Sequence, residues 1–409
     1  MGLLRILLAI AVLSGHAGSP LAHLRWLGAT LAVEIFFVIS GFYMQLVLST
    51  RYTKAKLGKT WVSQFYKARY FRLLPTYLLW SLIVAVAGWV LPTSAPLSIW
   101  RYVWGLPNTA GNFAFKIFLC FTNTTIFFQD VTQFLAVHNG LIHWSDNFRN
   151  SDVLLYRGLT VPPAWSLGIE LNFYLIAPYL LRLRSHWLLI GSCFCLAVKV
   201  IAIKALHLGD PWSYRFFPFE LGYFLLGALA FRYRHSLDGI LPKHIAKYCV
   251  YPLVIVFAAV RIPVPLPTLV YPIALACILP FLFRMTSGLK TDRLIGELSY
   301  PFYIFHYFLI GCARFIAGHW LHTSGNSVAV IGLSLTLPLS VIALALETHF
   351  IEPWRGRLAA PVANRTSREH NETRLATAYV RLVQGTFGAA VVRPPAGSDG
   401  QRIKSATSE

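Results

Sequence analysis

The chain has 409 residues, of which 56% are hydrophobic and 13% are charged, and its formal charge is +20. The apolar residues come in runs close to the length that spans a bilayer, which excludes a water-soluble domain and predicts a polytopic membrane protein. The basic residues lie between these runs and not along one surface stripe, so the expected partner is the lipid bilayer and not nucleic acid.

The apolar runs predict an all-α fold with about ten transmembrane helices. The predicted spans are residues 2–18, 29–49, 73–91, 163–182, 187–206, 214–232, 246–261, 267–285, 297–318 and 327–348. Basic residues gather in every second connection, at 51–72, 182–184, 232–247 and 290–293. Because Lys and Arg accumulate in cytosolic loops, these connections and both termini are assigned to the cytosol, which gives an N-in, C-in topology.

The first apolar run has a second interpretation. Arg5, the apolar residues 6–13 and the small residues 17–19 loosely resemble a cleaved signal peptide. Pro20, directly after the possible cleavage site, and the even number of spans favour an uncleaved first span.

Two other segments differ from the spans and define the predicted domains. Residues 1–350 form the transmembrane domain, within which residues 92–162 form a long non-cytosolic, periplasmic segment. The apolar stretch 113–128 in that segment is too short to cross comfortably and is re-entrant or interfacial. The segment is either a structural cover, or a lid or acceptor-binding surface. Residues 351–409 are predicted to be a basic, disordered cytosolic tail.

No metal or disulfide site is expected. The six cysteines lie mostly within or beside apolar runs, where a thiol behaves as a small hydrophobic group. His138 and His143 with Asp146 are best explained as solvated loop residues.

Arg5 and His16 are the first candidates for chemistry. At about 100° per residue, their spacing of eleven residues returns to the same helix face and climbs about 16 Å along the axis. Ionisable groups within a span cost about 2.5 kcal/mol or more, so this pair predicts that the face borders a polar cavity and not lipid.

Three carboxylates are predicted to lie at the depth of His16. Glu34, Glu170 and Glu220 come to about 20 to 22 Å from the cytosolic edge at about 1.5 Å per residue, and His16 comes to about 21 Å. Such a convergence is typical of a catalytic centre. The alternative is that these groups only tie helices together through hydrogen bonds.

A second group is expected at the cytosolic edge. Arg69 and Arg72 face the same way at a spacing of three residues, and Arg5 reaches the same level. They are either ordinary cytosolic anchors or a phosphate site, because guanidinium groups pair with phosphates. Acyl-coenzyme A has a phosphorylated head and a long neutral arm, so it fits the distance from the arginines to His16. His306 is expected along this donor path, where it contacts the donor or packs.

The segments that contain these candidate residues resemble the motifs of the acyltransferase 3 family of integral membrane proteins. Six segments match in order: Arg5 with His16, residues 32–42 (AVEIFFVISGF), 69–75 (RYFRLLP), 165–174 (WSLGIELNFY), 215–221 (RFFPFEL) and 298–306 (LSYPFYIFH). The resemblance implies a bacterial inner-membrane enzyme that takes acyl groups, often acetyl, from cytosolic acyl-coenzyme A and places them on sugars of surface or exported glycans.

The resemblance also implies residue roles. His16 is the essential histidine, and Arg5, Arg69 and Arg72 handle the donor. Separately from the resemblance, we take Trp165, Tyr174, Arg215 and Glu220 as acceptor-site candidates, and the two aromatics have an alternative role as interface anchors. Two features differ from the family: many members open with Asp-Gly-x-Arg-Gly where this chain has GLLRI at residues 2–6, and many carry a fused esterase-like domain where this chain has its basic tail.

The predicted mechanism uses His16 as general base on an acceptor hydroxyl that attacks the thioester. Glu34 or Glu170 accepts the other imidazole proton and fixes the tautomer, and a transient acyl-His16 is a second possibility. Acyl-coenzyme A is a co-substrate, and no bound cofactor is expected. The competing hypotheses are a proton-coupled transporter or flippase of a glycan or anionic substrate, and a membrane sensor with a recruiting tail. The acceptor's identity, the acyl length, the protein partners and the oligomeric state are not predicted.

Overall fold

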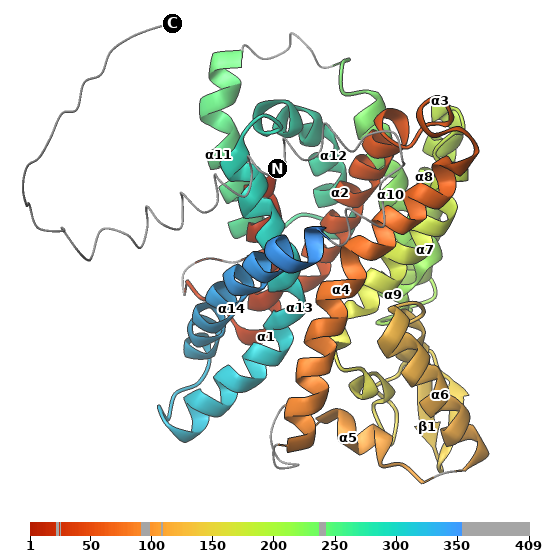
Figure 1. The fold of residues 1–409 in the computed structure, drawn as a ribbon, viewed down its shortest axis with the longest axis vertical. Coiled ribbons are helices and arrows are strands. Elements are labelled where there is room, and N and C mark those ends of the chain that lie inside the picture. The colour runs from red at the N-terminus through yellow and green to blue at the C-terminus, as the bar shows by residue number, and fades with distance from the viewer. Residues whose placement is uncertain (22–23, 25, 91–98, 108, 237–242, 354–409) are drawn as a thin grey trace, which may run out of the picture. The chain divides into compact units, whose positions relative to one another are not determined.

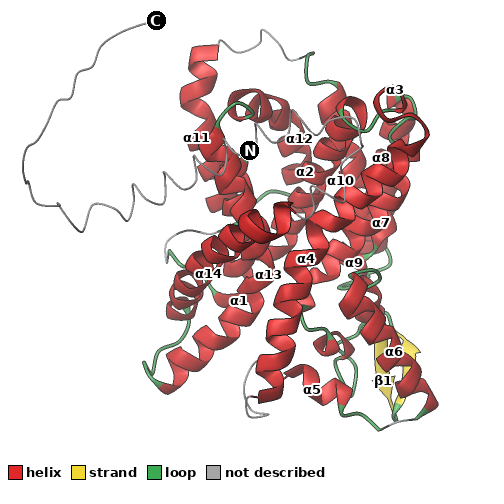
Figure 2. Cartoon of the chain, in the orientation of Figure 1, coloured by secondary structure: helices red, strands yellow, loops and turns green. Residues whose placement is uncertain are grey.

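The computed structural model describes residues 1–21, 24, 26–90, 99–107, 109–236 and 243–353, and helices dominate them (Figure 2). The helices are α1 (Gly2–Ala17), α2 (Ala29–Thr50), α3 (Lys54–Leu57), α4 (Trp61–Val90), α5 (Ile99–Trp104), α6 (Ala110–Thr125), α7 (Trp165–Leu180), α8 (Ser185–Lys204), α9 (Trp212–Arg215), α10 (Phe217–Arg232), α11 (Lys243–Ala259), α12 (Pro267–Thr286), α13 (Lys290–His319) and α14 (Asn326–Leu346). Two strands, β1 (Leu135–His138) and β2 (Leu141–Trp144), form an antiparallel hairpin.

Each of the ten predicted spans overlaps a helix, although α4 begins twelve residues before the span 73–91 and the span 214–232 is divided between α9 and α10. Among the described residues, six helices are long and apolar enough to cross a membrane: Ala29–Thr50, Lys54–Val90, Ser185–Lys204, Pro267–Thr286, Lys290–His319 and Asn326–Ile351. The other four, α1, α7, α10 and α11, have 16 or 17 residues, which corresponds to about 24 to 26 Å. The all-α membrane architecture is therefore confirmed, while the count of ten spans and the side on which the termini lie stay predictions.

Helices α2 and α10 cross closely at the centre of the fold (Figure 1). A Cβ added to Gly41 would lie 1.9 Å from the carbonyl oxygen of Phe224, and one added to Gly227 would lie 1.9 Å from that of Val38. Only glycine permits such backbone contact, which is how membrane helices gain packing contacts without a hydrophobic driving force. These two glycines set the distance between the helices that carry Glu34 and Glu220.

Helix α1 packs along α13, and its start is anchored there. A Cβ on Gly2 would lie 1.5 Å from the carbonyl oxygen of Asp292. The Asp292 carboxylate accepts hydrogen bonds from the backbone N–H groups of Gly2 (2.7 Å) and Leu3 (3.0 Å). A carboxylate at a helix N-terminus satisfies free N–H groups and opposes the helix dipole. The contact fixes the register of α1, and with it the positions of Arg5 and His16.

The long segment between α4 and α7 has a small core of its own. Its buried apolar residues are Val103, Phe115, Leu119, Val137, Val153, Leu155 and Leu159, and α5, α6 and β1 lie together at the lower end of Figure 1. The hairpin was not predicted, although Asn139-Gly140 is a strong signal for one. Both residues have positive φ, 51° and 76°.

Helix α6 contains the apolar stretch predicted to be re-entrant or interfacial. Leu119 is completely buried in the small core, whereas Phe113, Ile117 and Phe121 are exposed at a spacing of four residues. This pattern is typical of an amphipathic helix. The predicted tail, from residue 354 onward, lies outside the described residues.

Candidate active site

His16 lies in the last turn of α1 and faces α13. Its ring centroid is 5.6 Å from that of His306, with the planes inclined by 30°, and 5.6 Å from that of Tyr307 in an edge arrangement. Arg314 Nη2 donates a hydrogen bond of 2.7 Å to the His16 carbonyl oxygen, which supplies a positive charge to the C-terminal end of α1. The side chain of His16 is solvent-exposed, so another molecule can reach its ring.

His306 is completely buried, with an exposed fraction of 0%. Its Nδ1 lies 2.6 Å from the carbonyl oxygen of Tyr303. A carbonyl only accepts hydrogen bonds, so Nδ1 carries the proton and Nε2 holds the lone pair. Nε2 has no hydrogen-bond partner within the described part of the chain. The sequence placed His306 on the donor path, and the structure stacks it against His16.

Glu34 and Glu220 form a buried ion-pair cluster with Lys199. The Lys199 ammonium donates to Glu34 Oε1 and to Glu220 Oε1, each at 2.7 Å, and all three side chains are at most 1% exposed. The ring of Tyr223 lies 4.6 Å from the Lys199 nitrogen. Both carboxylates thus have a partner other than His16. Glu220 is completely buried, so an acceptor saccharide cannot contact it.

Glu170 belongs to a different group. Its Oε1 accepts hydrogen bonds from Ser40 (2.6 Å) and from the hydroxyl of Tyr174 (2.5 Å), and its charge acts on Arg5. Tyr174, a predicted acceptor residue, therefore lies with the arginines predicted to bind the donor. The four groups predicted to share one depth do not form one cluster. The orienting role of Glu34 or Glu170 toward His16 stays a prediction.

The three predicted donor arginines gather as one group. Arg72 is near enough to repel both Arg5 and Arg69 electrostatically, and Tyr174 interacts with Arg69 and Arg72. Arg72 is exposed, and Arg5 and Arg69 are half-buried. Two carboxylates, Glu170 and Glu297, act on Arg5. Three guanidinium groups beside two carboxylates leave an excess of positive charge, which suits a multiply charged anion.

A third group lies near the His16 end of α1 and contains two predicted acceptor residues, Trp165 and Arg215. The guanidinium carbon of Arg215 is 4.4 Å from the ring centroid of Trp165 and 4.4 Å from that of Tyr214. Ser166, next to Trp165, lies 2.7 Å from the hydroxyl of Tyr303, whose ring is 5.5 Å from His306. These contacts connect Trp165 to the two histidines.

Sequence reasoning missed Lys199, Arg314 and Tyr303. Lys199 lies in the predicted span 187–206. An ionisable group within a span is costly, and this reason for selecting the carboxylates applies equally to Lys199. Arg314 lies near the end of a predicted span and resembles an interface anchor in sequence. Nothing in the sequence distinguishes Tyr303 from neighbouring aromatics.

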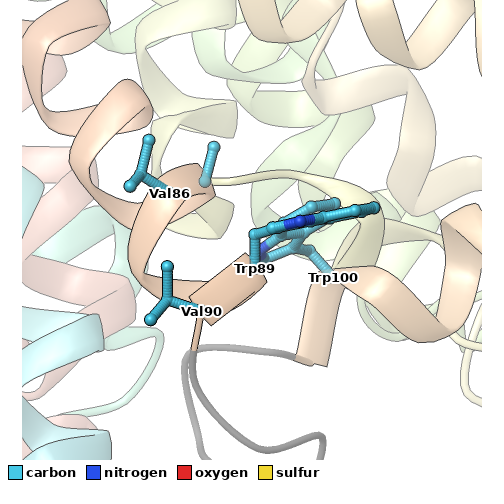
Figure 3. A pocket seen from close by; sticks show the side chains of 5 residues that line it. Val86, Trp89, Val90 and Trp100 are labelled. Carbon is cyan, nitrogen blue, oxygen red and sulfur yellow. The ribbon is translucent and has the colours of Figure 1, made fainter.

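A surface hollow lies elsewhere, where the end of α4 meets α5 (Figure 3). It is lined by Ala85, Val86, Trp89, Val90 and Trp100. None of these side chains is ionisable or nucleophilic, so this hollow is no candidate for chemistry.

The apolar helices define a multi-helix membrane protein. Its polar site contains the stacked histidines His16 and His306 and the group of Arg5, Arg69 and Arg72. A family model for an acyltransferase domain matches residues 1–345, so the chain belongs to the acyltransferase 3 family and is an acyltransferase. It is 28% identical over 186 residues to the peptidoglycan O-acetyltransferase OatA of Listeria monocytogenes, an alignment that covers 45% of this chain and 24% of that protein. The chain thus matches about a quarter of that relative's length. No solved structure matches it.

Proposed function

We propose that this chain is an acyl-coenzyme A-dependent O-acyltransferase of the bacterial inner (plasma) membrane. It transfers an acyl group, most simply acetyl, to a hydroxyl of a cell-surface or exported saccharide, and it crosses the membrane about ten times with both termini in the cytosol. The observation that carries the proposal is the placement of Arg5 and His16 on α1. The first belongs to the arginine group and the second lies about 16 Å further along the helix, beside His306. The name of the Listeria relative supports acetyl as the group and a glycan as the acceptor.

The donor binds with its phosphates at Arg5, Arg69 and Arg72. Guanidinium groups make paired, charge-assisted hydrogen bonds with phosphate oxygens. The neutral arm of the coenzyme then runs along α1 and brings the thioester to His16. Glu170 and Tyr174 line this route, because Tyr174 bonds to Glu170 and interacts with Arg69.

The transfer begins when the imidazole of His16 takes the proton of the acceptor hydroxyl. The hydroxyl oxygen attacks the thioester carbonyl, and a carbon–oxygen bond forms. The carbon–sulfur bond then breaks, and the leaving thiolate takes the proton from the imidazolium. In a variant of this route, the imidazole nitrogen attacks first, the thiolate of coenzyme A leaves, and a transient acyl-His16 forms. The acceptor hydroxyl then attacks this acyl group, the carbon–nitrogen bond breaks, and the hydroxyl proton passes to the released imidazole. No metal or resident cofactor takes part in either route.

The test uses labelled acetyl-coenzyme A and purified full-length protein. We expect His16→Ala to lower acetyl transfer by about 100-fold or more, the usual size of a general-base contribution, and to keep donor binding. We expect Arg69→Gln with Arg72→Gln to weaken donor binding by about tenfold, because each guanidinium makes charge-assisted bonds to phosphate. Binding and transfer are measured on the same preparations.

His186→Ala is the matched control, because His186 is an exposed histidine at the start of α8. Its transfer rate should equal that of the wild type. Unchanged transfer in His16→Ala would contradict both chemical routes. Folded wild-type protein that binds no acetyl-coenzyme A would contradict the proposed donor and favour a transporter.

A further inference from the structure

Three arginines from separate parts of the chain meet at the His16 end of α1. Arg314, in the last two turns of α13, donates to the carbonyl oxygen of His16 at 2.7 Å. Arg215, at the end of α9, lies against Tyr214 and is near enough to act on His16 electrostatically. Arg157, in the segment before α7, acts on Tyr307, whose ring contacts that of His16. We call these three residues the outer arginine group.

The charge of the outer arginine group is only partly compensated. Asp210 Oδ1 accepts from Arg215 Nε at 2.6 Å, but Asp210 Oδ2 also pairs with Arg149 at 2.6 Å. No other carboxylate forms an ion pair with these arginines in the part of the chain that the structure describes. Arg157 and Arg314 are both exposed. All three arginines act electrostatically on Tyr307, so their positive charge is best balanced by an anion from outside the chain.

The membrane topology does not account for these arginines. Lys and Arg anchor helices mainly on the cytosolic side, and in the proposed orientation that side carries Arg5 at the opposite end of α1. The outer arginine group lies at the other end, where the acceptor must arrive. Arg314 bonds to His16, and Arg215 acts on it electrostatically. Their anion therefore belongs to the molecule that reaches the reacting group and not to a lipid headgroup at the periphery.

Aromatic rings lie beside the same arginines. Tyr214 and Tyr307 are half-buried, and the rings of Tyr214 and Trp165 lie 5.4 Å apart. Flat aromatic faces pack against the apolar faces of sugar rings, and guanidinium groups bind carboxylates and phosphates in paired hydrogen bonds. We propose that the acceptor is an acidic saccharide, whose sugar ring contacts Tyr214 and Tyr307 and whose carboxylate or phosphate is held by the outer arginine group. This inference rests on the proposed function and names the acceptor class of its site.

Binding of two matched saccharides tests the inference without turnover. The probes are a hyaluronan tetrasaccharide and the same tetrasaccharide with its carboxylates reduced to alcohols, titrated calorimetrically into full-length protein in phosphatidylcholine nanodiscs. We expect the acidic form to bind about tenfold more tightly at low salt and to lose most of this advantage at about 0.5 M salt, because salt screens exposed charges.

Variants assign the preference to the outer arginine group. Arg157→Gln with Arg314→Gln should reduce the preference for the acidic form to about twofold or less and leave acetyl-coenzyme A binding unchanged. Arg184→Gln is the matched control, because Arg184 is an exposed arginine before α8. It should keep the full preference.

The inference would be overturned by equal binding of the two saccharides, by binding of neither, by a preference that persists in the double variant, or by a preference that Arg184→Gln also removes. The alternative that the arginines bind lipid headgroups is tested in nanodiscs that contain phosphatidylglycerol. If the acidic saccharide binds in phosphatidylcholine nanodiscs but not in these, the arginines are assigned to lipid headgroups and the inference is wrong. Failure of the proposed function is distinguishable, since it appears as absent acetyl-coenzyme A binding or transfer and not as lost charge preference.

Discussion

His16 and His306 lie side by side in opposite surroundings. His16 is exposed, whereas His306 is completely buried and its Nδ1 is bonded to the carbonyl oxygen of Tyr303. The backbone bond fixes the tautomer of His306 and leaves Nε2 as an acceptor without a described partner. His306 is therefore best explained as a positioning residue for His16.

Two conservative variants of His306 distinguish the roles of its two ring nitrogens, Nδ1 and Nε2. The amide of Asn reaches the position of Nδ1, and that of Gln reaches the position of Nε2. If Nε2 supports the reaction, we expect His306→Gln to retain more transfer activity than His306→Asn, with each losing about tenfold or more. Activity is compared as kcat and KM for acetyl-coenzyme A, together with the pH dependence of kcat.

His319 provides the control on the same helix. Its Nδ1 also faces a backbone carbonyl, that of Phe315 at 3.2 Å, but His319 is exposed. His319→Asn and His319→Gln should behave like the wild type. Equal activity of the two His306 variants would show that Nε2 has no role, and a KM effect alone would assign His306 to donor binding.

Helices α2, α8 and α10 are joined by one ion-pair cluster. Glu34, Lys199 and Glu220 come from the three helices in turn, and each is at most 1% exposed. Two carboxylates and one ammonium leave an excess negative charge inside the bundle when all are ionised. Breaking a buried ion pair by removing one partner is costly, because the other charge remains without compensation.

Lys199→Met tests this structural role. We expect it to destabilise the protein by about 3 to 5 kcal/mol, measured as a lower thermal unfolding temperature in detergent. Adding Glu34→Gln and Glu220→Gln should recover most of the loss, because it removes the two uncompensated charges. Lys204→Met, an exposed lysine in the last turn of the same helix, should have no effect.

The triple variant also tests the predicted role of Glu34 in catalysis. If Glu34 only joins helices, the recovered protein should transfer acetyl within about threefold of the wild type. A folded triple variant that has lost transfer would instead support Glu34 as the residue that orients His16.

Over the whole molecule, positive charge gathers at both ends of α1. Arg5, Arg69 and Arg72 lie at one end and the outer arginine group at the other, so the formal charge of +20 reflects more than topology. Asp292 holds the start of α1 by bonding to the backbone of Gly2 and Leu3. A carboxylate from α13 therefore satisfies the free N–H groups at the start of α1.

The stability of the whole molecule should depend on Asp130, in the segment between α4 and α7. Burial raises the pKa of Asp130 from its ordinary value of 3.8 to about 7, against the opposing effect of backbone hydrogen bonds. The folded protein then binds more protons than the unfolded chain between these two values, so this group lowers stability as pH rises from about 4 to 7. Above pH 7 the loss is complete and constant.

Asp130→Asn should remove this dependence. We expect its thermal unfolding temperature to match that of the wild type near pH 4 and to exceed it at pH 7 and above. Asp146→Asn, at an exposed aspartate of the same segment, should match the wild type throughout. Parallel curves for wild type and Asp130→Asn would contradict the raised pKa.

Much of the fold follows from the sequence, and less of the site does. Helices occur at all ten predicted spans, because an apolar run in a membrane must satisfy its backbone internally and so becomes a helix. The hairpin at β1 and β2 was missed although Asn139-Gly140 signals it. Glu34 and Glu220, which were predicted at one depth, bind the same Lys199 nitrogen, but Lys199 was not among the predicted site residues.

The sequence by itself determined where the helices lie, that Arg5 and His16 belong to one of them, and the family. All of these depend on local patterns of residues along the chain. Only the tertiary structure decided that His306 stacks on His16, that Tyr174 lies with the arginines predicted to bind the donor, and that Lys199 binds Glu34 and Glu220. The physical reason is that depth along a helix does not specify the direction in which a side chain points, and the partner of each side chain depends on which helices pack together.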